Sequence, residues 1–84
     1  MSNPVNNWEI KNNKLIRKYD FDSFMNAIEF INKVAEVAEE MDHHPLIKNV
    51  YSTVEFELWS HDQNAITDSD YSLAEAIETL WEGM

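Results

Sequence analysis

The sequence predicts an α+β fold, a small antiparallel sheet with helices packed on one of its faces. Apolar and mixed side chains alternate from Val50 to Trp59, which is typical of a strand with one buried face. Two longer segments, 22 to 41 and 67 to 82, carry apolar residues at helical spacing instead. Since strands precede the first helical segment and separate it from the second, two helices are expected to cover one face of the sheet.

Composition and charge limit the class of protein. All 84 residues are expected to form one domain, small enough that self-association would help to stabilise it. The net charge is −10, and residues 39 to 84 hold eleven acids against the single base Lys48, so direct binding to nucleic acid or an anionic membrane is not expected. The absence of cysteine excludes disulfides and cysteine-ligated zinc. No secretory leader or membrane-length apolar run is recognisable, so we expect a cytoplasmic protein.

The first part of the chain predicts a flexible start and a strand hairpin. Residues 1 to 7 form the flexible start. Strands over 8 to 11 and 14 to 19 are expected to be joined at Asn12-Asn13, since asparagine tolerates the positive φ of a tight turn. Either face of the second strand could be the buried one, and one of the two faces is formed by Leu15, Arg17 and Tyr19.

A long helix should follow this hairpin. Asp22 is expected to cap it, because its carboxylate can accept hydrogen bonds from free backbone N–H groups. Pro45 disfavours helical geometry at the residue before it, so the helix should stop near His43 and leave His44 extended. The apolar stripe expected to face the core consists of Phe24, Ala27, Ile28, Ile31, Ala35, Ala38 and Met41.

The second helix has a start signal of its own. Thr67 and Asp70 have the spacing of the N-cap and N3 residues of a capping box. The residues themselves therefore predict two helices and three strands. The inner face of the second helix is expected to consist of Leu73, Ala74, Ile77, Leu80 and Trp81.

All three histidines, His43, His44 and His61, lie between residues 39 and 70. Histidine exchanges protons near neutral pH, so several together suit a reaction that needs both an acid and a base. Glu39, one helical turn before His43, is placed to hydrogen-bond it and to favour the charged imidazole. Two other interpretations stay open, namely separate structural histidines and a metal site of three imidazoles, although no HExxH-like spacing is present.

These histidines belong to a longer spaced pattern. It reads Glu39, three residues, His43-His44-Pro45, five residues, Tyr51, nine residues, His61, eight residues and Asp70. This pattern resembles the signature of the pterin-4a-carbinolamine dehydratase family. One departure is Ala65, which stands where the family commonly has a glycine. The tryptophan, the L-x-R and the F-x-x-F-x-x-A-x-x-F of the family are matched by Trp8, Leu15, Arg17, Phe21, Phe24, Ala27 and Phe30.

The resemblance implies a fold, a reaction and a set of site residues. It implies helices on a four-stranded antiparallel sheet, with the fourth strand near 64 to 67, and a homodimer or homotetramer. The implied reaction is dehydration of a 4a-hydroxytetrahydropterin to quinonoid dihydropterin, in tetrahydropterin recycling, without metal or redox cofactor. The alternative is a non-catalytic module of the same fold that binds a protein partner, as a transcriptional coactivator or an assembly factor.

The resemblance also assigns roles to individual residues. Tyr51 is expected to be a buried aromatic residue that helps to shape the site. Asp70 has the competing structural role of a helix cap, described above. The implied roles are acid–base catalysis for His43 and His61, pterin binding for His44 and Pro45, and support for Glu39 and Asp70.

Overall fold

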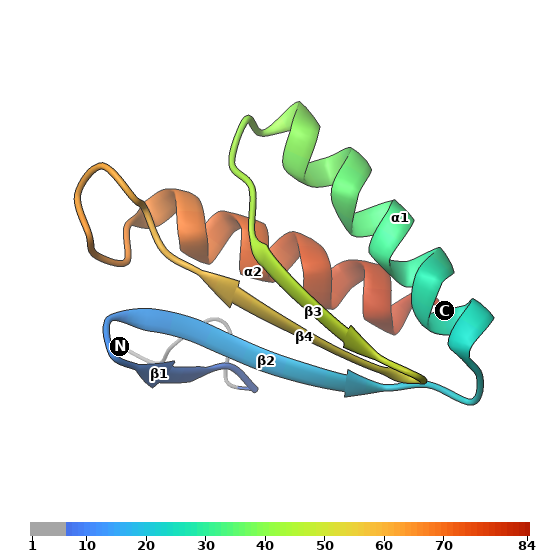
Figure 1. Cartoon of the computed structure of the whole chain (residues 1–84). Coiled ribbons are helices and arrows are strands. Elements are labelled where there is room, and N and C mark those ends of the chain that lie inside the picture. The colour runs from blue at the N-terminus through green and yellow to red at the C-terminus, as the bar shows by residue number, and fades with distance from the viewer. Residues whose placement is uncertain (1–6) are drawn as a thin grey trace.

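The computed structural model describes residues 7–84, which form a four-stranded antiparallel sheet with two helices on one face (Figure 1). The strand order is β1-β2-β4-β3, and the predicted α+β class is confirmed. The flexible start predicted for residues 1 to 7 lies, apart from Asn7, outside the described residues. The elements are β1 (Glu9–Lys11), β2 (Lys14–Asp20), α1 (Phe24–Glu40), β3 (Leu46–Val50), β4 (Thr53–Leu58) and α2 (Asp68–Glu82).

The first hairpin forms as predicted. β1 pairs with β2, and the chain reverses at Asn12 and Asn13, whose φ angles are 52° and 62°. Both angles lie in the left-handed region, which asparagine adopts more readily than most residues.

The second hairpin differs from the prediction of a single strand from Val50 to Trp59, which is wrong. The chain reverses at Tyr51, whose φ is 53°, and β3 then pairs antiparallel with β4. The Tyr51 side chain is 83% exposed at this turn, so the expectation of a buried aromatic residue is also wrong. The fourth strand is β3 rather than a segment near 64 to 67, where Ser60 and Ala65 form only an isolated bridge.

Helix α1 begins one residue later than predicted. Ser23, not Asp22, is the N-cap, and its Oγ accepts a hydrogen bond from the N–H of Asn26 at 3.1 Å. The predicted apolar stripe is partly wrong, because Phe24 is 52% exposed and Ala35 is also exposed. The buried stripe instead consists of Ala27, Phe30, Val34 and Ala38.

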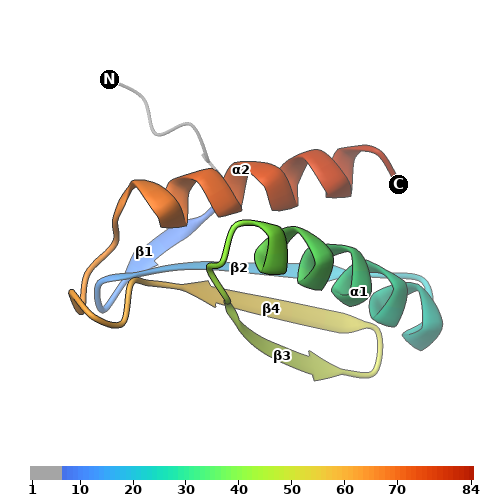
Figure 2. The same cartoon turned by 90° about the horizontal axis from the view of Figure 1, so that it is seen from above.

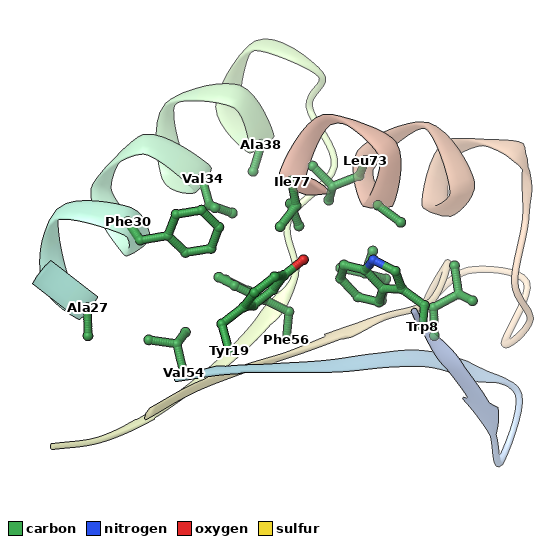
Figure 3. Packing of buried hydrophobic residues seen from close by; sticks show 13 residues of the cluster. Trp8, Tyr19, Ala27, Phe30, Val34, Ala38, Val54, Phe56, Leu73 and Ile77 are labelled. Atoms are coloured by element: carbon green, nitrogen blue, oxygen red, sulfur yellow. The ribbon is translucent and has the colours of Figure 1, made fainter. Parts of the chain in front are cut away.

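The core lies between the helices and the sheet, and its centre is aromatic (Figure 3). The ring of Tyr19 lies 5.1 Å from Phe30 and 4.9 Å from Trp81, centroid to centroid. Tilted contacts at these distances favour the attraction between ring edges and ring faces. They join β2 to both helices, which run side by side over the sheet (Figure 2). The predicted inner face of α2 is confirmed, since Leu73, Ala74 and Ile77 are buried and Leu80 and Trp81 pack against the core.

A polar cluster ties β2 to α2 beside these rings. Arg17 lies on the helix-covered face of β2, and its Nε donates to Glu78 Oε2 at 3.1 Å. The Tyr19 hydroxyl donates to the same carboxylate oxygen. Burial, together with this hydrogen bond, raises the pKa of Tyr19 well above its ordinary value of 10. The cluster fixes α2 relative to the sheet, and α2 in turn carries part of the site.

Candidate active site

The end of helix α1 determines where the first histidine lies. The helix ends at Glu40, one residue before the predicted Met41, and Asp42 takes a φ of 52°. The N–H of Asp42 then bonds to the carbonyl of Glu39 at 3.1 Å, and the N–H of His43 bonds to the carbonyl of Ala38 at 3.0 Å. These two bonds define a Schellman motif, in which Asp42 occupies the position usually held by glycine. The motif turns the chain sharply before the extended residues that precede β3.

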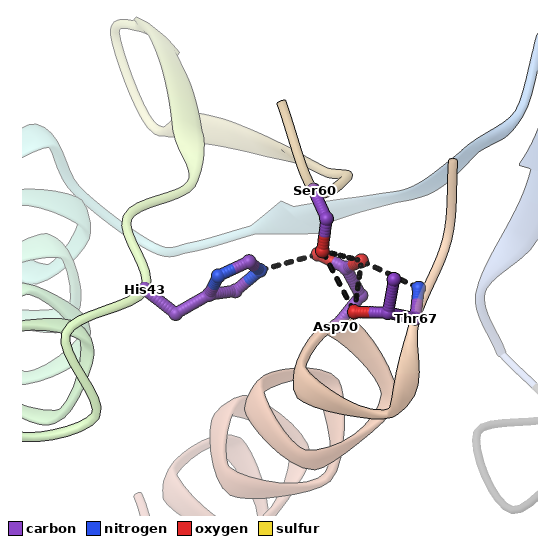
Figure 4. A network of polar contacts seen from close by, with 4 residues as sticks. All are labelled: His43, Ser60, Thr67 and Asp70. Atoms are coloured by element: carbon purple, nitrogen blue, oxygen red, sulfur yellow. Dashed lines mark hydrogen bonds and ion pairs between the residues drawn. The ribbon is translucent and has the colours of Figure 1, made fainter. Parts of the chain in front are cut away.

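His43 contacts the start of α2 after this turn (Figure 4). Its Nε2 lies 2.5 Å from Oδ1 of Asp70, a carboxylate that is fully buried, while the imidazole itself is 18% exposed. An ionised carboxylate can only accept, so Nε2 carries the proton of this hydrogen bond. The other ring nitrogen, Nδ1, is thereby left for exchange of a proton with another group.

Asp70 is held from its other oxygen as well. Its Oδ2 accepts from the backbone N–H of Thr67 at 2.8 Å and from the hydroxyl of Ser60 at 3.0 Å. The first of these bonds belongs to the predicted capping box of α2, which is confirmed. Asp70 therefore makes two separate contacts, since Oδ2 caps the helix and Oδ1 bonds to His43.

Glu39 does not bond to His43, contrary to the prediction. It bonds instead to His44, whose Nε2 lies 2.8 Å from Oε1 of Glu39. The turn at Asp42 is the reason, because it directs His43 toward α2 while His44 faces the last turn of α1. The pair is open to solvent, with the two side chains 59% and 82% exposed, so it contributes little to stability.

His61 is placed by a different kind of contact. It follows Ser60 directly, is exposed, and stacks its ring on Trp59 with the centroids 4.3 Å apart and the planes 5° apart. Within residues 7–84, no hydrogen bond joins His61 to His43 or His44. His61 directly follows Ser60, whose hydroxyl donates a hydrogen bond to Asp70. The backbone therefore places His61 one residue from the hydrogen bonds around Asp70.

Of the remaining predicted residues, Pro45 lies beside the histidines and Tyr51 does not. Pro45 is half-buried and follows His44 directly, at the start of the segment that leads into β3. Tyr51 lies at the turn between β3 and β4, at the opposite end of β3 from Pro45 (Figure 1), and so lies apart from the site. Ala65 has no positive φ; the left-handed residue of that turn is Asn64, with φ 51°. Replacement of a glycine at Ala65 therefore causes no strain.

Two contacts of the site are not predicted from the sequence. Ser60 is buried and bonds to Asp70, and Trp59 stacks on His61. The sequence offered a signal for Ser60 in its place beside His61. It offered one for Trp59 in its place two residues before His61 at the end of the predicted strand, since residues i and i+2 of a strand share a side.

Among residues 7–84, no group of three or more histidine, cysteine or acidic side chains lies close enough together to hold a metal ion. No helix among residues 7–84 has the length and apolarity to cross a membrane.

The fold and the site together define a class of protein: a small α+β domain in which a buried carboxylate orients a histidine suited to proton transfer. The family model for pterin 4 alpha carbinolamine dehydratase matches residues 1–80, and the chain belongs to this family.

Relatives of known sequence and structure agree with this assignment. A Prochlorococcus marinus (strain MIT 9303) protein with the name "Putative pterin-4-alpha-carbinolamine dehydratase" is 45% identical over 76 residues, which cover 90% of this chain and 79% of the relative. A crystal structure of a transcriptional coactivator/pterin dehydratase from Brucella melitensis has a TM-score of 0.85 and 29% identity, with 88% of this chain and 81% of the other covered. A pterin dehydratase-like protein described as a RuBisCO assembly factor in the alpha-carboxysome has the same fold, with a TM-score of 0.71, 20% identity and coverage of 87% and 84%.

Proposed function

We propose that this protein catalyses the dehydration of 4a-hydroxytetrahydropterin to quinonoid dihydropterin and water, as a step of tetrahydropterin recycling. The reaction needs one proton delivered to the leaving hydroxyl and one proton removed from a ring nitrogen of the pterin. After the reaction the acid of the enzyme has lost one proton and the base has gained one, and proton exchange with solvent returns both groups to their starting state. No redox change accompanies these steps.

His43 acts as the acid in this proposal and His61 as the base. The observation that carries it is the hydrogen bond between His43 and the fully buried carboxylate of Asp70. The carboxylate fixes the orientation and the tautomer of the imidazole, and so determines which ring nitrogen is left for the substrate. Because Nε2 is held by Asp70, Nδ1 delivers the proton to the hydroxyl group that leaves.

His44 and Pro45 bind the pterin, and Glu39 supports His44. The hydrogen bond that Oε1 of Glu39 accepts from Nε2 of His44 orients this exposed imidazole and leaves its other nitrogen for the substrate. Truncation of His44 should accordingly raise KM more than it lowers kcat.

Stopped-flow absorbance of enzymatically generated 4a-carbinolamine tests the proposal. His43→Ala and His61→Ala should each lower kcat by roughly 100-fold or more, because positioned acids and bases contribute about that much. Glu29→Ala, an exposed change in the first half of α1 and ten residues before Glu39, is the matched control and should leave the rate unchanged. The proposal is wrong if His43→Ala, His44→Ala and His61→Ala all dehydrate the substrate as fast as the wild type.

A protein-binding role is the second candidate. Phe24 and Met25 are exposed at the start of α1, which is an unusual place for two large apolar side chains in succession. A wild type without dehydratase activity that forms a stoichiometric complex with one protein would favour this role, and loss of the complex in Met25→Asp would assign it to this surface.

A further inference from the structure

Trp59 has a position that suits it to act on His61. β4 ends at Leu58, and Trp59 and His61 follow on the same side of the chain, with Ser60 directed to the other side toward Asp70. The two rings are nearly parallel, 5° from coplanar, and their centroids are 4.3 Å apart. This is a face-to-face contact between an indole and an imidazole rather than a chance approach of ring edges.

Trp59 is itself fixed by a second contact. The ammonium group of Lys14 lies 4.3 Å from the centroid of the indole, within the range of a cation–π interaction. Lys14 is in turn 3.6 Å from Oε1 of Glu57, which is buried on β4. The indole therefore has a defined place at the end of the sheet, although it follows the last residue of the strand.

The stack is the contact that orients the His61 ring. His43 and His44 each have a carboxylate at Nε2, whereas no hydrogen bond to the His61 imidazole is found within residues 7–84. A carboxylate orients a histidine through a hydrogen bond that occupies one of its two ring nitrogens. A stacked ring orients it through its face and leaves both nitrogens free, which suits a group that must accept a proton.

We infer that Trp59 is a positioning residue for the base His61, fixing the plane of its imidazole by stacking. The inference rests on the proposed function. Trp59 restricts the rotation of an exposed side chain before substrate binds, so less rotational freedom is lost on the way to the transition state. Since Trp59 acts through His61, its loss should lower kcat and leave KM nearly unchanged.

The variants Trp59→Leu and Trp59→Phe separate stacking from mere apolar bulk. Leucine removes the aromatic face, and it should lower kcat roughly three- to tenfold, the range expected from the energy of one aromatic pair. Phenylalanine keeps a face to stack on and should restore most of the rate. In a His61→Ala background, Trp59→Leu should have no further effect, because the group it positions is absent.

The ring protons of His61 give a readout that does not depend on activity. In the NMR spectrum of the wild type they should be shifted upfield by the ring current of Trp59, and Trp59→Leu should remove the shift. The inference is overturned if Trp59→Leu leaves either the shifts or kcat at wild-type values, or if it slows the His61→Ala protein as much as the wild type. A wild type without dehydratase activity overturns the proposed function and this inference together, whereas an active wild type matched by Trp59→Leu overturns the inference alone.

Discussion

Replacement of Asp70 by asparagine is the most informative single change in the site. It keeps the volume of a fully buried side chain and removes its charge. The two oxygens of Asp70 accept from His43 and from the Thr67 N–H, and asparagine has one oxygen for these two bonds. We expect the remaining oxygen to keep the helix cap, so that His43 loses its acceptor.

The size of the effect follows from the bond that is lost. A hydrogen bond to a charged group contributes about 1.5–3 kcal/mol, so Asp70→Asn should lower kcat by about 10- to 100-fold. The free energy of unfolding should also fall by about 1.5–3 kcal/mol, because the same hydrogen bond stabilises the folded protein. Stopped-flow dehydration measures the first quantity, and urea denaturation followed by tryptophan fluorescence measures the second.

Asp68→Asn is the matched control. Asp68 is the first residue of α2, is exposed, and carries the same charge near the same helix terminus. Its replacement should cost about 0.3–1 kcal/mol of stability through the helix dipole and leave kcat unchanged. The account of His43 is refuted if Asp70→Asn is folded and has wild-type kcat, or if Asp68→Asn slows the reaction as much.

Three further predictions concern the fold and its assembly. Ser23→Ala should destabilise the protein by about 1 kcal/mol in urea denaturation by removing the cap of α1, whereas Asp22→Ala should not, and the reverse order would restore Asp22 as the cap. The hydrogen bond from Lys48 lowers the pKa of Glu57 below its ordinary value of 4.5, so the ion pair stabilises the fold above pH 4.5 and this stability is lost as the pH falls through the lowered pKa. Lys48→Met should therefore make the free energy of unfolding depend less on pH in this acid range. An unchanged dependence would contradict this role of Lys48. Light scattering should give the mass of a homodimer or homotetramer, and a monomer at micromolar concentration would contradict this.

The sequence predicts most where a local rule and the tertiary structure agree. Asn12 and Asn13 tolerate the turn that the hairpin needs, so the alternation on either side of them could be interpreted correctly. Thr67 and Asp70 satisfy backbone groups within one helical turn, which depends on spacing alone. In both cases the residues that determine the structure are adjacent or nearly adjacent in the chain.

The errors arise where the backbone turns at a residue that does not signal a turn. Tyr51 and Asp42 both adopt positive φ without being glycine or asparagine. The alternation across Tyr51 therefore resembled one long strand. The turn at Asp42 was not predicted either, and His43 was assigned the wrong carboxylate because this turn directs it away from Glu39 and toward α2.

Contacts between distant parts of the chain explain the rest. The partner of His43 lies 27 residues away, and its identity depends on how α2 packs beside α1. The family resemblance named Asp70 as a supporting residue, but its buried hydrogen bond to His43 is seen only in the folded structure. The stack of Trp59 on His61 has no counterpart in the motif and follows only from the geometry of the end of β4.

The rate of 4a-carbinolamine dehydration by the wild type and by His43→Ala tests the central claim most directly. The account predicts that the wild type accelerates the loss of water and that His43→Ala, shown to be folded by circular dichroism, loses roughly 100-fold or more of kcat. A folded His43→Ala protein with undiminished kcat would contradict the assignment of the acid. A wild type that gives no acceleration would contradict the proposed reaction itself.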